Sequence, residues 1–459
     1  MDDATARLLR ETAERAIEYL SDLDARHVGA IEDADAIAQR LRGLPDGPQD
    51  PTAVIGQIAS EVDGGLVASA GPRYFGFVIG GALPASVAAD WLSAAWDQNG
   101  ALYALSPAAA AAEQVAGEWM LDLLGLPADW SFGLPTGAGL GNAVGLAAGR
   151  HAVLAKLGWD VETKGLYGAP EIEVICGAEA HATALSALQY LGLGRDRVTR
   201  VPVDDQGAMR ADAFAEAMAG AADRPVLALA QAGNVNTGAF DPLDAVADAT
   251  DRHPNAWLHV DGAFGAWAAV SAGLAHLVTG MNRADSVSTD AHKWLNVNYD
   301  CGFVAVRDQA AHRAAMAVSA AYLLAGQGRR ESWEYVLDSS RRARGFALYA
   351  TLRSLGRSGV RDLVERCCDL ADQMAARLAA EDGITVLNRV VLNQVLVRFG
   401  DDDATTNEVI GRVQQEGIAW MGGTVWQGRA AMRISVSNWS TTPADIDQTA
   451  DSIIRAFRR

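Results

Sequence analysis

Between residues 111 and 307 the sequence alternates between short apolar runs and runs with the apolar spacing of helices. The expected strands cover 171–177, 197–203, 224–233, 256–264, 286–292 and 301–307. The expected helices cover 111–126, 141–158, 181–193, 211–220 and 241–253. Short apolar strands that alternate with helices are typical of a mostly parallel sheet buried on both faces. The sequence therefore predicts an α/β fold, in which ligands bind beyond the carboxyl ends of the strands.

The pattern differs at both ends of the chain. Residues 1–70 predict amphipathic helices and a linker rich in Gly, Pro and Asp, with few residues for a core of their own. After about 345, two long helices precede two strands that alternate with two further helices. We therefore expect an N-terminal helical segment over 1–70, packed on the rest of the chain or on a partner subunit. A large α/β domain over 71–345 and a small α+β domain over 346–459 complete the expected organisation.

Charge and cysteine content exclude several classes of protein. The 459 residues carry a net charge of −19, which argues against a nucleic acid or an anionic membrane as partner. Four irregularly spaced cysteines do not predict a disulfide framework or a zinc site. The first 20 residues lack the apolar core of a signal peptide, and no apolar run reaches 18 residues. We expect a cytoplasmic protein that acts on a small molecule and holds no metal.

Lysine is rare in this chain. Of 38 basic residues only three are lysines, namely Lys156, Lys164 and Lys293. Arginine replaces lysine wherever a positive charge suffices, but it cannot act as a neutral amine nucleophile because its pKa stays above about 12. Lys156 ends a helix and Lys164 lies in a polar connection, whereas Lys293 follows a predicted strand. A surface lysine that packs on Trp294 is the plain alternative for Lys293.

Four features fall at the ends of successive predicted elements. They are a glycine-rich turn that opens a helix (135–142), His181 after one strand, Asp261 at the end of another, and Lys293. A helix N-terminus binds phosphate, and a buried carboxylate needs a cationic partner. Each feature also has a structural explanation, as a tight turn, a helix-start residue, a turn cap or a surface lysine. Together they match pyridoxal phosphate, with Lys293 on the aldehyde, Asp261 on the ring nitrogen and His181 on the ring face.

The same residues resemble those of the fold-type I pyridoxal-phosphate enzymes of the group II decarboxylase family. This family includes the aromatic-L-amino-acid, glutamate and diaminobutyrate decarboxylases. The resemblance is carried by Asp290–Leu295 (DAHKWL), 259–264 (HVDGAF), Ala180-His181 and 233–242 (GNVNTGAFDP). It extends from about residue 70 to the last predicted strand.

The resemblance implies further cofactor contacts. It places Ala263 on the ring face opposite His181, sets Ala138, Gly139 and Asn234 around the cofactor, and puts His292 near the phosphate or the substrate carboxylate. Many family members carry Thr or Ser where this chain has Gly139, so one hydroxyl contact to the phosphate is missing. The family also forms homodimers with the active sites at the interface.

The implied reaction is decarboxylation of an L-amino acid to the amine through an external aldimine and a quinonoid intermediate. Tyr74, Phe75 and Tyr103 are expected on the substrate side, which favours an aromatic or bulky amino acid, while Arg73 leaves an acidic substrate open. The polar stretch 324–340 is expected to be a mobile loop that closes over the substrate. Tyr335 is its only tyrosine and is predicted to protonate the substrate carbon. Core packing is the alternative for all of these aromatic residues.

Other functions remain open at this point. On the same cofactor, the chain is alternatively an aldehyde-forming oxidative decarboxylase, an aminotransferase or a carbon–carbon lyase. A dinucleotide-binding oxidoreductase needs the spacing G-x-G-x-x-G after a strand, whereas residues 137–141 have G-x-G-x-G and no clear strand precedes them. A cofactor-free binding protein gives no reason to retain Lys293.

Overall fold

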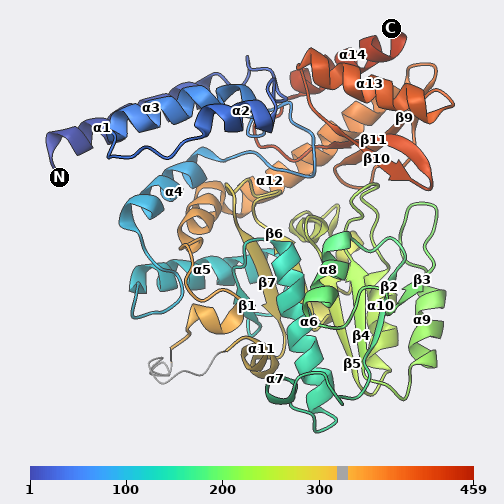
Figure 1. Cartoon of the computed structure of the whole chain (residues 1–459). Coiled ribbons are helices and arrows are strands. Elements are labelled where there is room, and N and C mark those ends of the chain that lie inside the picture. Colours follow the sequence, from blue (N-terminus) through green and yellow to red (C-terminus); the bar gives the residue numbers. More distant parts are fainter. Residues whose placement is uncertain (318–328) are drawn as a thin grey trace. The chain divides into compact units, whose positions relative to one another are not determined.

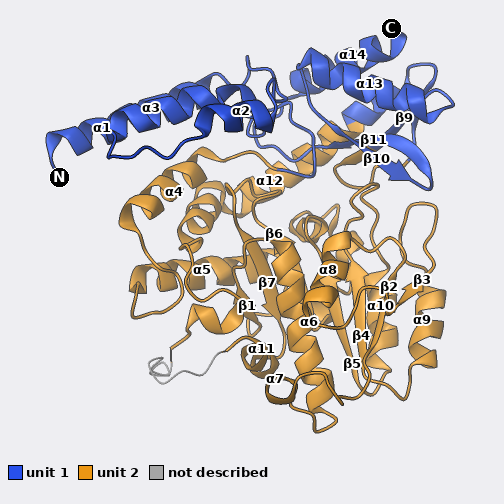
Figure 2. Ribbon diagram, viewed as in Figure 1, with its two compact units in different colours: residues 1–79, 373–387, 396–459 blue, residues 80–372, 388–395 orange. Residues whose placement is uncertain are grey.

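The computed structural model describes residues 1–317 and 329–459 (Figure 1). The chain forms two compact units (Figure 2): unit 1 comprises 1–79, 373–387 and 396–459, and unit 2 comprises 80–372 and 388–395. The N-terminal segment is thus not separate but joins the C-terminal part, for example through the Val28 N–H, which donates to Gly417 O at 2.9 Å. The boundary predicted at 345 lies instead at 372.

Unit 2 contains a seven-stranded sheet with the order β1-β7-β6-β5-β4-β2-β3. The strands are β1 (Ser131–Gly133), β2 (Glu173–Gly177), β3 (Val198–Val201), β4 (Val226–Gln231), β5 (Ala256–Asp261), β6 (Ser286–Asp290) and β7 (Gly302–Val306). Strands β3, β2, β4, β5 and β6 are parallel, and β7 runs antiparallel to both β6 and β1. The predicted mostly parallel α/β fold is therefore confirmed. Strand β1 was not predicted, although it lies directly before the glycine-rich turn.

Helices cover this sheet (Figure 1). They are α4 (Pro84–Trp96), α5 (Pro107–Leu123), α6 (Ala138–Ala155), α7 (Val161–Lys164), α8 (Ala182–Tyr190), α9 (Ala211–Gly220), α10 (Leu243–Asp251), α11 (Gln309–Met316) and α12 (Gly345–Ala379), whose last residues belong to unit 1. Short 3-10 turns are η2 (Gly265–Val270), η3 (Ala275–Val278), η4 (Met281–Arg283) and η5 (Ser332–Tyr335). Gly356, with φ 63°, interrupts α12, so the two long helices predicted from the sequence are both present.

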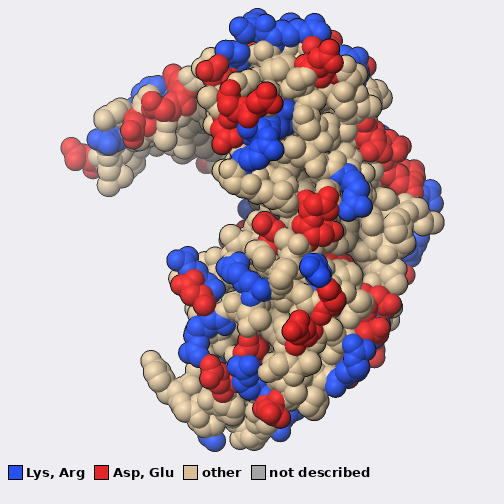
Figure 3. Space-filling view, turned by 90° about the vertical axis from the view of Figure 1, so that its right-hand side faces the viewer, with Lys and Arg blue, Asp and Glu red and all other residues tan. Residues whose placement is uncertain are grey.

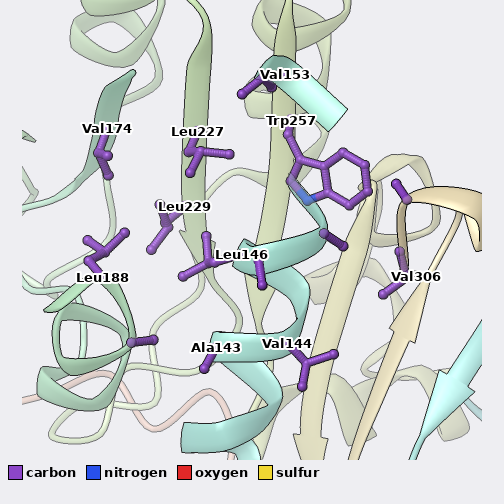
Figure 4. Close-up of a cluster of buried hydrophobic side chains, with 14 of the residues drawn as sticks. Ala143, Val144, Leu146, Val153, Val174, Leu188, Leu227, Leu229, Trp257 and Val306 are labelled. Carbon is purple, nitrogen blue, oxygen red and sulfur yellow. The ribbon is translucent and has the colours of Figure 1, made fainter. Parts of the chain in front are cut away.

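Helix α6 and its neighbours bury one face of the sheet. Leu146 of α6 and Leu188 of α8 pack with Leu227 and Leu229 of β4 and with Trp257 of β5 (Figure 4). Full burial of such a side chain contributes about 1.5–3 kcal/mol. This apolar cluster fixes α6 against the strands whose carboxyl ends carry the polar residues described below.

Three glycines let α6 approach the sheet closely. A Cβ added at Gly149 would lie 2.6 Å from the Trp257 ring, one at Gly145 would lie 2.6 Å from His259 Nδ1, and one at Gly141 would lie 3.0 Å from Ser288 Cβ. Because side chains alternate along a strand, Trp257, His259 and Asp261 all share the face of β5 that meets α6. The glycine at every fourth position of α6 therefore sets how near polar groups of the helix come to β5.

Unit 1 combines helices with a small sheet of order β10-β11-β9-β8. Its elements are α1 (Asp3–Ser21), α2 (Ala34–Leu41), α3 (Pro51–Val62), η1 (Asp63–Gly65), β8 (Ile384–Val386), β9 (Gln394–Phe399, whose first two residues belong to unit 2), α13 (Asp403–Glu416), β10 (Gly422–Trp426), β11 (Arg429–Ser435) and α14 (Pro443–Arg458). Leu396, Trp426 and Ala431 form a buried cluster on the sheet. The predicted α+β character of the C-terminal part is confirmed.

Acidic and basic side chains are interspersed on the face shown in Figure 3. Within the described residues, no helix has the length and apolar character needed to cross a membrane. The same residues contain no cluster of three or more His, Cys, Asp or Glu side chains suited to a metal ion.

Candidate active site

A cavity of about 170 Å³ lies in unit 2 at the carboxyl ends of the parallel strands. It is lined by Gly137, Ala138, Gly139, His181, Thr183, Gln231, Gly233, Val235, Asp261, Ala263, Phe264, Asp290, His292 and Lys293. Seven residues predicted from the sequence are among them: Lys293, Asp261, His181, Ala138, Gly139, Ala263 and His292. The cavity is therefore the place where the predicted features meet.

Lys293 lies in the connection between β6 and β7, and its ammonium group faces a carboxylate. Lys293 Nζ lies 3.0 Å from Asp290 Oδ2, at the end of β6. Asp290 Oδ1 accepts a hydrogen bond of 2.6 Å from the Ala138 N–H, the first residue of α6. Asp290 therefore links the lysine to the N-terminus of α6. In the sequence, Asp290 is recognisable only as part of the motif around Lys293, and no local signal predicts its contact with α6.

The N-terminus of α6 lies at the cavity, where the glycine-rich turn predicted a phosphate site. Gly137, the residue before the helix, makes no side-chain cap, and Gly137, Ala138 and Gly139 all line the cavity. A Cβ added at Gly302 would lie 2.6 Å from the Gly137 backbone, which shows how closely β7 approaches the turn. A Cβ at Gly139 would only touch Thr183, at 3.6 Å. The Thr183 atoms that face Gly139 are its Cβ and its methyl group, whereas its hydroxyl lies 2.7 Å from His181 Nδ1.

Asp261 ends β5 and is 5% exposed. Its Oδ2 accepts a 2.9 Å hydrogen bond from Asn142 Nδ2, and its Oδ1 accepts one of 3.2 Å from the Ala263 N–H. Both donors are neutral, and among the described residues Asp261 forms no ion pair. A buried carboxylate with only neutral donors, on the wall of a cavity, is suited to a cationic N–H donor such as a protonated pyridine ring.

Two histidines line the cavity and both have defined partners. His181, just before α8, donates its backbone N–H to Gln231 Oε1 at 3.0 Å, and its Nδ1 lies 2.7 Å from Thr183 Oγ1. His292 Nδ1 accepts the Cys301 N–H at 3.2 Å, so its Nε2 carries the ring proton. Burial lowers the pKa of His292, which keeps the ring neutral at physiological pH. Gln231 ends β4, and the strand-end rule that found Asp261 would also have found it.

Asn234 does not line the cavity. It is buried, and its Oδ1 accepts the backbone N–H groups of Asn236 at 2.8 Å and Thr237 at 3.2 Å. Its neighbours Gly233 and Val235 reach the cavity instead. Asn234 therefore shapes the turn after β4 in this structure.

The predicted substrate-side residues make contacts within their own units. In unit 1, the Tyr74 ring stacks on Trp420 at 5.1 Å, and Phe75 is buried. Tyr103, in unit 2, is half-buried under the Arg329 guanidinium, 4.3 Å from its ring centre, and it does not line the cavity. Their role on the substrate side stays a prediction.

Arg73, the residue that left an acidic substrate open, has its charge matched within unit 1. Its Nη1 donates to Asp445 Oδ1 at 2.9 Å, its Nε to Ile418 O at 2.9 Å, and its Nη2 to Asp24 O. The guanidinium is therefore bound by three acceptors of its own unit. These contacts favour a structural role for Arg73 within unit 1, and a role in binding an acidic substrate stays untested.

Tyr335 is also placed differently from the prediction. It ends the turn η5, is 2% exposed, and its hydroxyl accepts a hydrogen bond from Gln309 Nε2 at 3.0 Å. Its ring packs against His312 and under Arg330, and it does not line the cavity. Residues 324–328 of the predicted loop lie outside the described residues, whereas Ser332, Trp333, Tyr335 and Val336 are buried. The role of Tyr335 as a proton donor is thus not supported, and packing explains its position.

Comparison with known proteins also points to pyridoxal phosphate as the cofactor. The pyridoxal-dependent decarboxylase conserved domain matches residues 36–399. Tryptophan decarboxylase 1 of Oryza sativa subsp. japonica is 26% identical and covers 94% of this chain and 90% of its own length. Aromatic-L-amino-acid decarboxylase of Bacillus atrophaeus is 24% identical over 94% and 91%, respectively. The acidic amino acid decarboxylase GADL1 of Homo sapiens is 29% identical, over 69% of this chain and 61% of that protein.

Solved structures show the same fold. Oryza sativa TDC with PLP and tryptamine has a TM-score of 0.92 at 22% identity and covers 100% of this chain and 98% of that one. Mouse CSAD has a TM-score of 0.90 at 21% identity, with 99% of each chain covered. Rhodiola rosea 4-hydroxyphenylacetaldehyde synthase has a TM-score of 0.88 at 19% identity, with coverage of 100% and 99%. The chain therefore belongs to the pyridoxal-dependent decarboxylases, carboxy-lyases that act on amino acids with pyridoxal phosphate as cofactor.

Proposed function

We propose that this protein decarboxylates an aromatic or bulky L-amino acid to the corresponding amine and carbon dioxide. One observation carries the proposal: Lys293 is the only Lys or Arg among the described residues that line the cavity. Because its amine would bond to the cofactor aldehyde, Lys293 is not available to pair with an acidic substrate side chain. Val235, Ala263 and Phe264 supply apolar wall next to it. Such a cavity favours a substrate whose side chain needs no cation.

The proposed residue roles follow from the geometry around the cavity. Lys293 would bond to the cofactor aldehyde and Asp261 would pair with the ring nitrogen, while the N–H groups of α6 that follow Ala138, whose own N–H is bound to Asp290, would bind the phosphate. His181 would cover one ring face and Ala263 the other, and His292 lines the cavity with its Nε2 3.4 Å from Asp290 Oδ1. Pyridoxal phosphate, when bound, supplies a conjugated ring that accepts the electron pair of the broken carbon–carbon bond. Asp261 stabilises the positive ring nitrogen that this electron flow requires.

An acidic substrate is less well supported by this chain. A side-chain carboxylate taken into the cavity would meet Asp261 and Asp290, and no guanidinium among the described lining residues would compensate it. Arg73 is already bound to Asp445. Tryptophan decarboxylase 1 and aromatic-L-amino-acid decarboxylase, which each cover 94% of this chain, are named for aromatic substrates, which points the same way.

The test incubates the cofactor-loaded protein separately with L-tryptophan, L-tyrosine, L-phenylalanine, L-leucine, L-glutamate and L-aspartate. Carbon dioxide and the organic product are measured by mass spectrometry, with Lys293→Ala as the blank. We expect amines from the aromatic or bulky substrates, and kcat/KM at least about 10-fold lower for the acidic ones. Higher turnover of glutamate or aspartate would overturn the substrate class. Aldehyde with ammonia and peroxide in place of amine would overturn the product.

We further propose that the working form is a homodimer. Helices α1 and α3 contain no fully buried residue, and Leu9, Ile17, Leu20, Val54 and Ile58 on them are exposed. A second copy that covers these side chains removes apolar surface from water. Light scattering coupled to size exclusion should give twice the chain mass of 48.3 kDa for the active species. An active monomer would contradict this assembly.

A further inference from the structure

A chain of buried hydrogen bonds leads from the sheet to Asp261. Its five members are Trp257, Ser286, His259, Asn142 and Asp261. Trp257 Nε1 lies 2.9 Å from Ser286 Oγ, and Ser286 Oγ lies 2.8 Å from His259 Nδ1. His259 Nε2 lies 2.9 Å from Asn142 Oδ1, and Asn142 Nδ2 lies 2.9 Å from Asp261 Oδ2. His259, Asn142 and Ser286 are 0% exposed, so water does not compete for these contacts.

The direction of every hydrogen bond in this chain is determined by its acceptor end. A carboxylate only accepts, so the Asn142 amide nitrogen must face Asp261 and its oxygen must face His259. An amide oxygen only accepts, so His259 Nε2 carries the proton. Burial lowers the pKa of His259 to about 4, and the ring therefore holds this single proton at neutral pH. His259 Nδ1 then accepts from the Ser286 hydroxyl, whose oxygen accepts the Trp257 N–H.

A second donor stabilises the same orientation of Asn142. The Ser288 hydroxyl also donates to Asn142 Oδ1, so this oxygen accepts two hydrogen bonds. A rotated amide would place its oxygen against the Asp261 carboxylate and its NH₂ group against the proton on His259 Nε2. The close approach at Gly145, where a Cβ would lie 2.6 Å from His259 Nδ1, leaves the histidine ring no room to move away. This series of hydrogen bonds is therefore rigid, and every donor in it points toward Asp261 or toward a group that is held in place by the next acceptor.

We propose that Asn142 and His259 are positioning residues that hold Asp261 in the orientation needed to pair with the cofactor ring nitrogen. The inference rests on the role of Asp261 in the proposed function. Without the Asn142 amide, Asp261 keeps only the 3.2 Å contact with the Ala263 N–H, on its other oxygen. The carboxylate is then free to turn about its side-chain bond. Neither Asn142 nor His259 lines the cavity, so both act through Asp261.

Asn142→Leu tests the first link, because leucine has a similar shape and donates no hydrogen bond. We expect kcat to fall about 10- to 100-fold, as for loss of a residue that orients a catalytic group, with KM changed less than about 3-fold. The visible absorbance of the lysine-bound cofactor should acquire a different pH dependence, because the ring nitrogen is no longer held protonated. The matched control is Asn255→Leu, since Asn255 Nδ2 donates to Val153 O at 2.9 Å near the other end of α6. It should keep the parental spectrum.

Two substitutions of His259 test the hydrogen bond between His259 and Asn142, and both remove the imidazole ring. In His259→Gln, the amide nitrogen takes the place of Nε2 and still donates to Asn142. In His259→Asn, the shorter side chain keeps a polar atom near Ser286 and loses the contact with Asn142. We expect His259→Gln to keep kcat within about 3-fold of the parent, and His259→Asn to fall about 10-fold or more. Equal losses in the two variants would mean that His259 serves packing alone and would overturn its role.

Asp261→Asn in the same series separates this inference from the proposed function. Parental turnover and spectrum in Asp261→Asn would show that Asp261 is not the ring partner, and the proposed function would fail at that residue. A large loss in Asp261→Asn together with parental kcat, KM and spectrum in Asn142→Leu would overturn the positioning role alone. Should Asn142→Leu fail to fold, the His259 pair still decides the question through the cofactor spectrum and the dissociation constant for pyridoxal phosphate.

Discussion

Each unit contains buried charged residues, and their partners differ. In unit 1, the Arg73 guanidinium donates to Asp445, to Ile418 O and to Asp24 O. In unit 2, Asp261 accepts only neutral donors and Lys293 shares one carboxylate, and both side chains line a cavity. The Arg73 charge is matched by a carboxylate and two carbonyl oxygens, which suits a structural role. Asp261 is a buried carboxylate on a cavity wall with neutral donors only, and such a group is available to a cationic ligand.

Lys293→Ala should give the largest effect, because it removes the amine that the cavity offers. We expect decarboxylation to fall by about 1,000-fold or more, with the fold retained. In the parent, borohydride reduction should fix the cofactor on the peptide that contains Lys293. A label on Lys156 or Lys164 would instead place the cofactor outside this cavity, and Lys293 would then not be a ligand-binding residue.

Arg73→Ala should affect stability and leave the chemistry intact. Arg73 is the buried partner of this ion pair, and its removal also leaves the carbonyl oxygens of Ile418 and Asp24 without their donor, so the loss should be about 3 kcal/mol. Urea unfolding measures this loss, while kcat per bound cofactor should stay at the parental value. The control is Arg455→Ala, which breaks the exposed pair with Glu416 and costs less than about 1 kcal/mol. A lower kcat with unchanged stability would make Arg73 a substrate residue after all.

His312 gives unit 2 a pH dependence that is separate from the cavity. Its Nε2 lies 3.0 Å from Tyr335 O and its Nδ1 lies 2.9 Å from Ser131 Oγ, and burial lowers its pKa to about 3. Below pH 6.5 the unfolded chain gains this proton first, so the free energy of unfolding falls as the pH drops from about 6.5 toward 3. Buried His259 contributes with the same sign down to about pH 4. Asp241 contributes with the opposite sign between 3.8 and about 6, because burial raises its pKa to about 6.

Comparison of the parent with His312→Gln isolates one histidine from these groups. Glutamine keeps a donor for Tyr335 O and does not titrate. Between pH 7 and pH 5.5 the parent should lose about 1.3 kcal/mol more than the variant in the free energy of unfolding. Equal losses would show that His312 is not buried in solution as the structure has it.

Tyr335→Phe should give the smallest effect. It removes the hydrogen bond from Gln309 Nε2, which contributes about 1 kcal/mol to stability. The organic product of decarboxylation should stay the amine, because the Tyr335 hydroxyl is turned to Gln309 and does not reach the cavity. A rise in aldehyde and peroxide with unchanged stability would restore its role as a proton donor.

The sheet and the residues at its strand ends were predictable because their signals are local. Apolar runs of strand length gave β2 to β7, and the same runs located Asp261 and Lys293 at their ends. The three-residue strand β1 has too few residues for a pattern of its own and forms through pairing with β7. Of the mobile loop predicted over 324–340, the described part contains both buried residues, such as Ser332 and Tyr335, and exposed ones, such as Leu337, and its mobility stays a prediction.

Asn142 shows why part of the site could not be predicted. In the sequence it is one polar residue among alanines and glycines, and nothing local connects it with Asp261, 119 residues later. The contact arises from the close packing of α6 on β5, which the glycines at 141, 145 and 149 permit. Tyr74 and Phe75 show a second limit, since an aromatic residue that packs in a core and one that contacts a substrate look the same in the local sequence.

The antiparallel pairing of β6 and β7 has a consequence for the order of folding. Residues 291–301 join these two strands, and Ala291 and His292 both donate backbone hydrogen bonds to Cys301 O, so the segment that contains Lys293 closes over a short stretch of chain. The loop-closure entropy of such a hairpin is small. The Ala138 N–H reaches Asp290 across 152 residues, and this contact needs the whole sheet in place. The segment that bears the reactive amine is therefore closed by contacts near in sequence, whereas the cavity around it depends on contacts between distant parts of the chain.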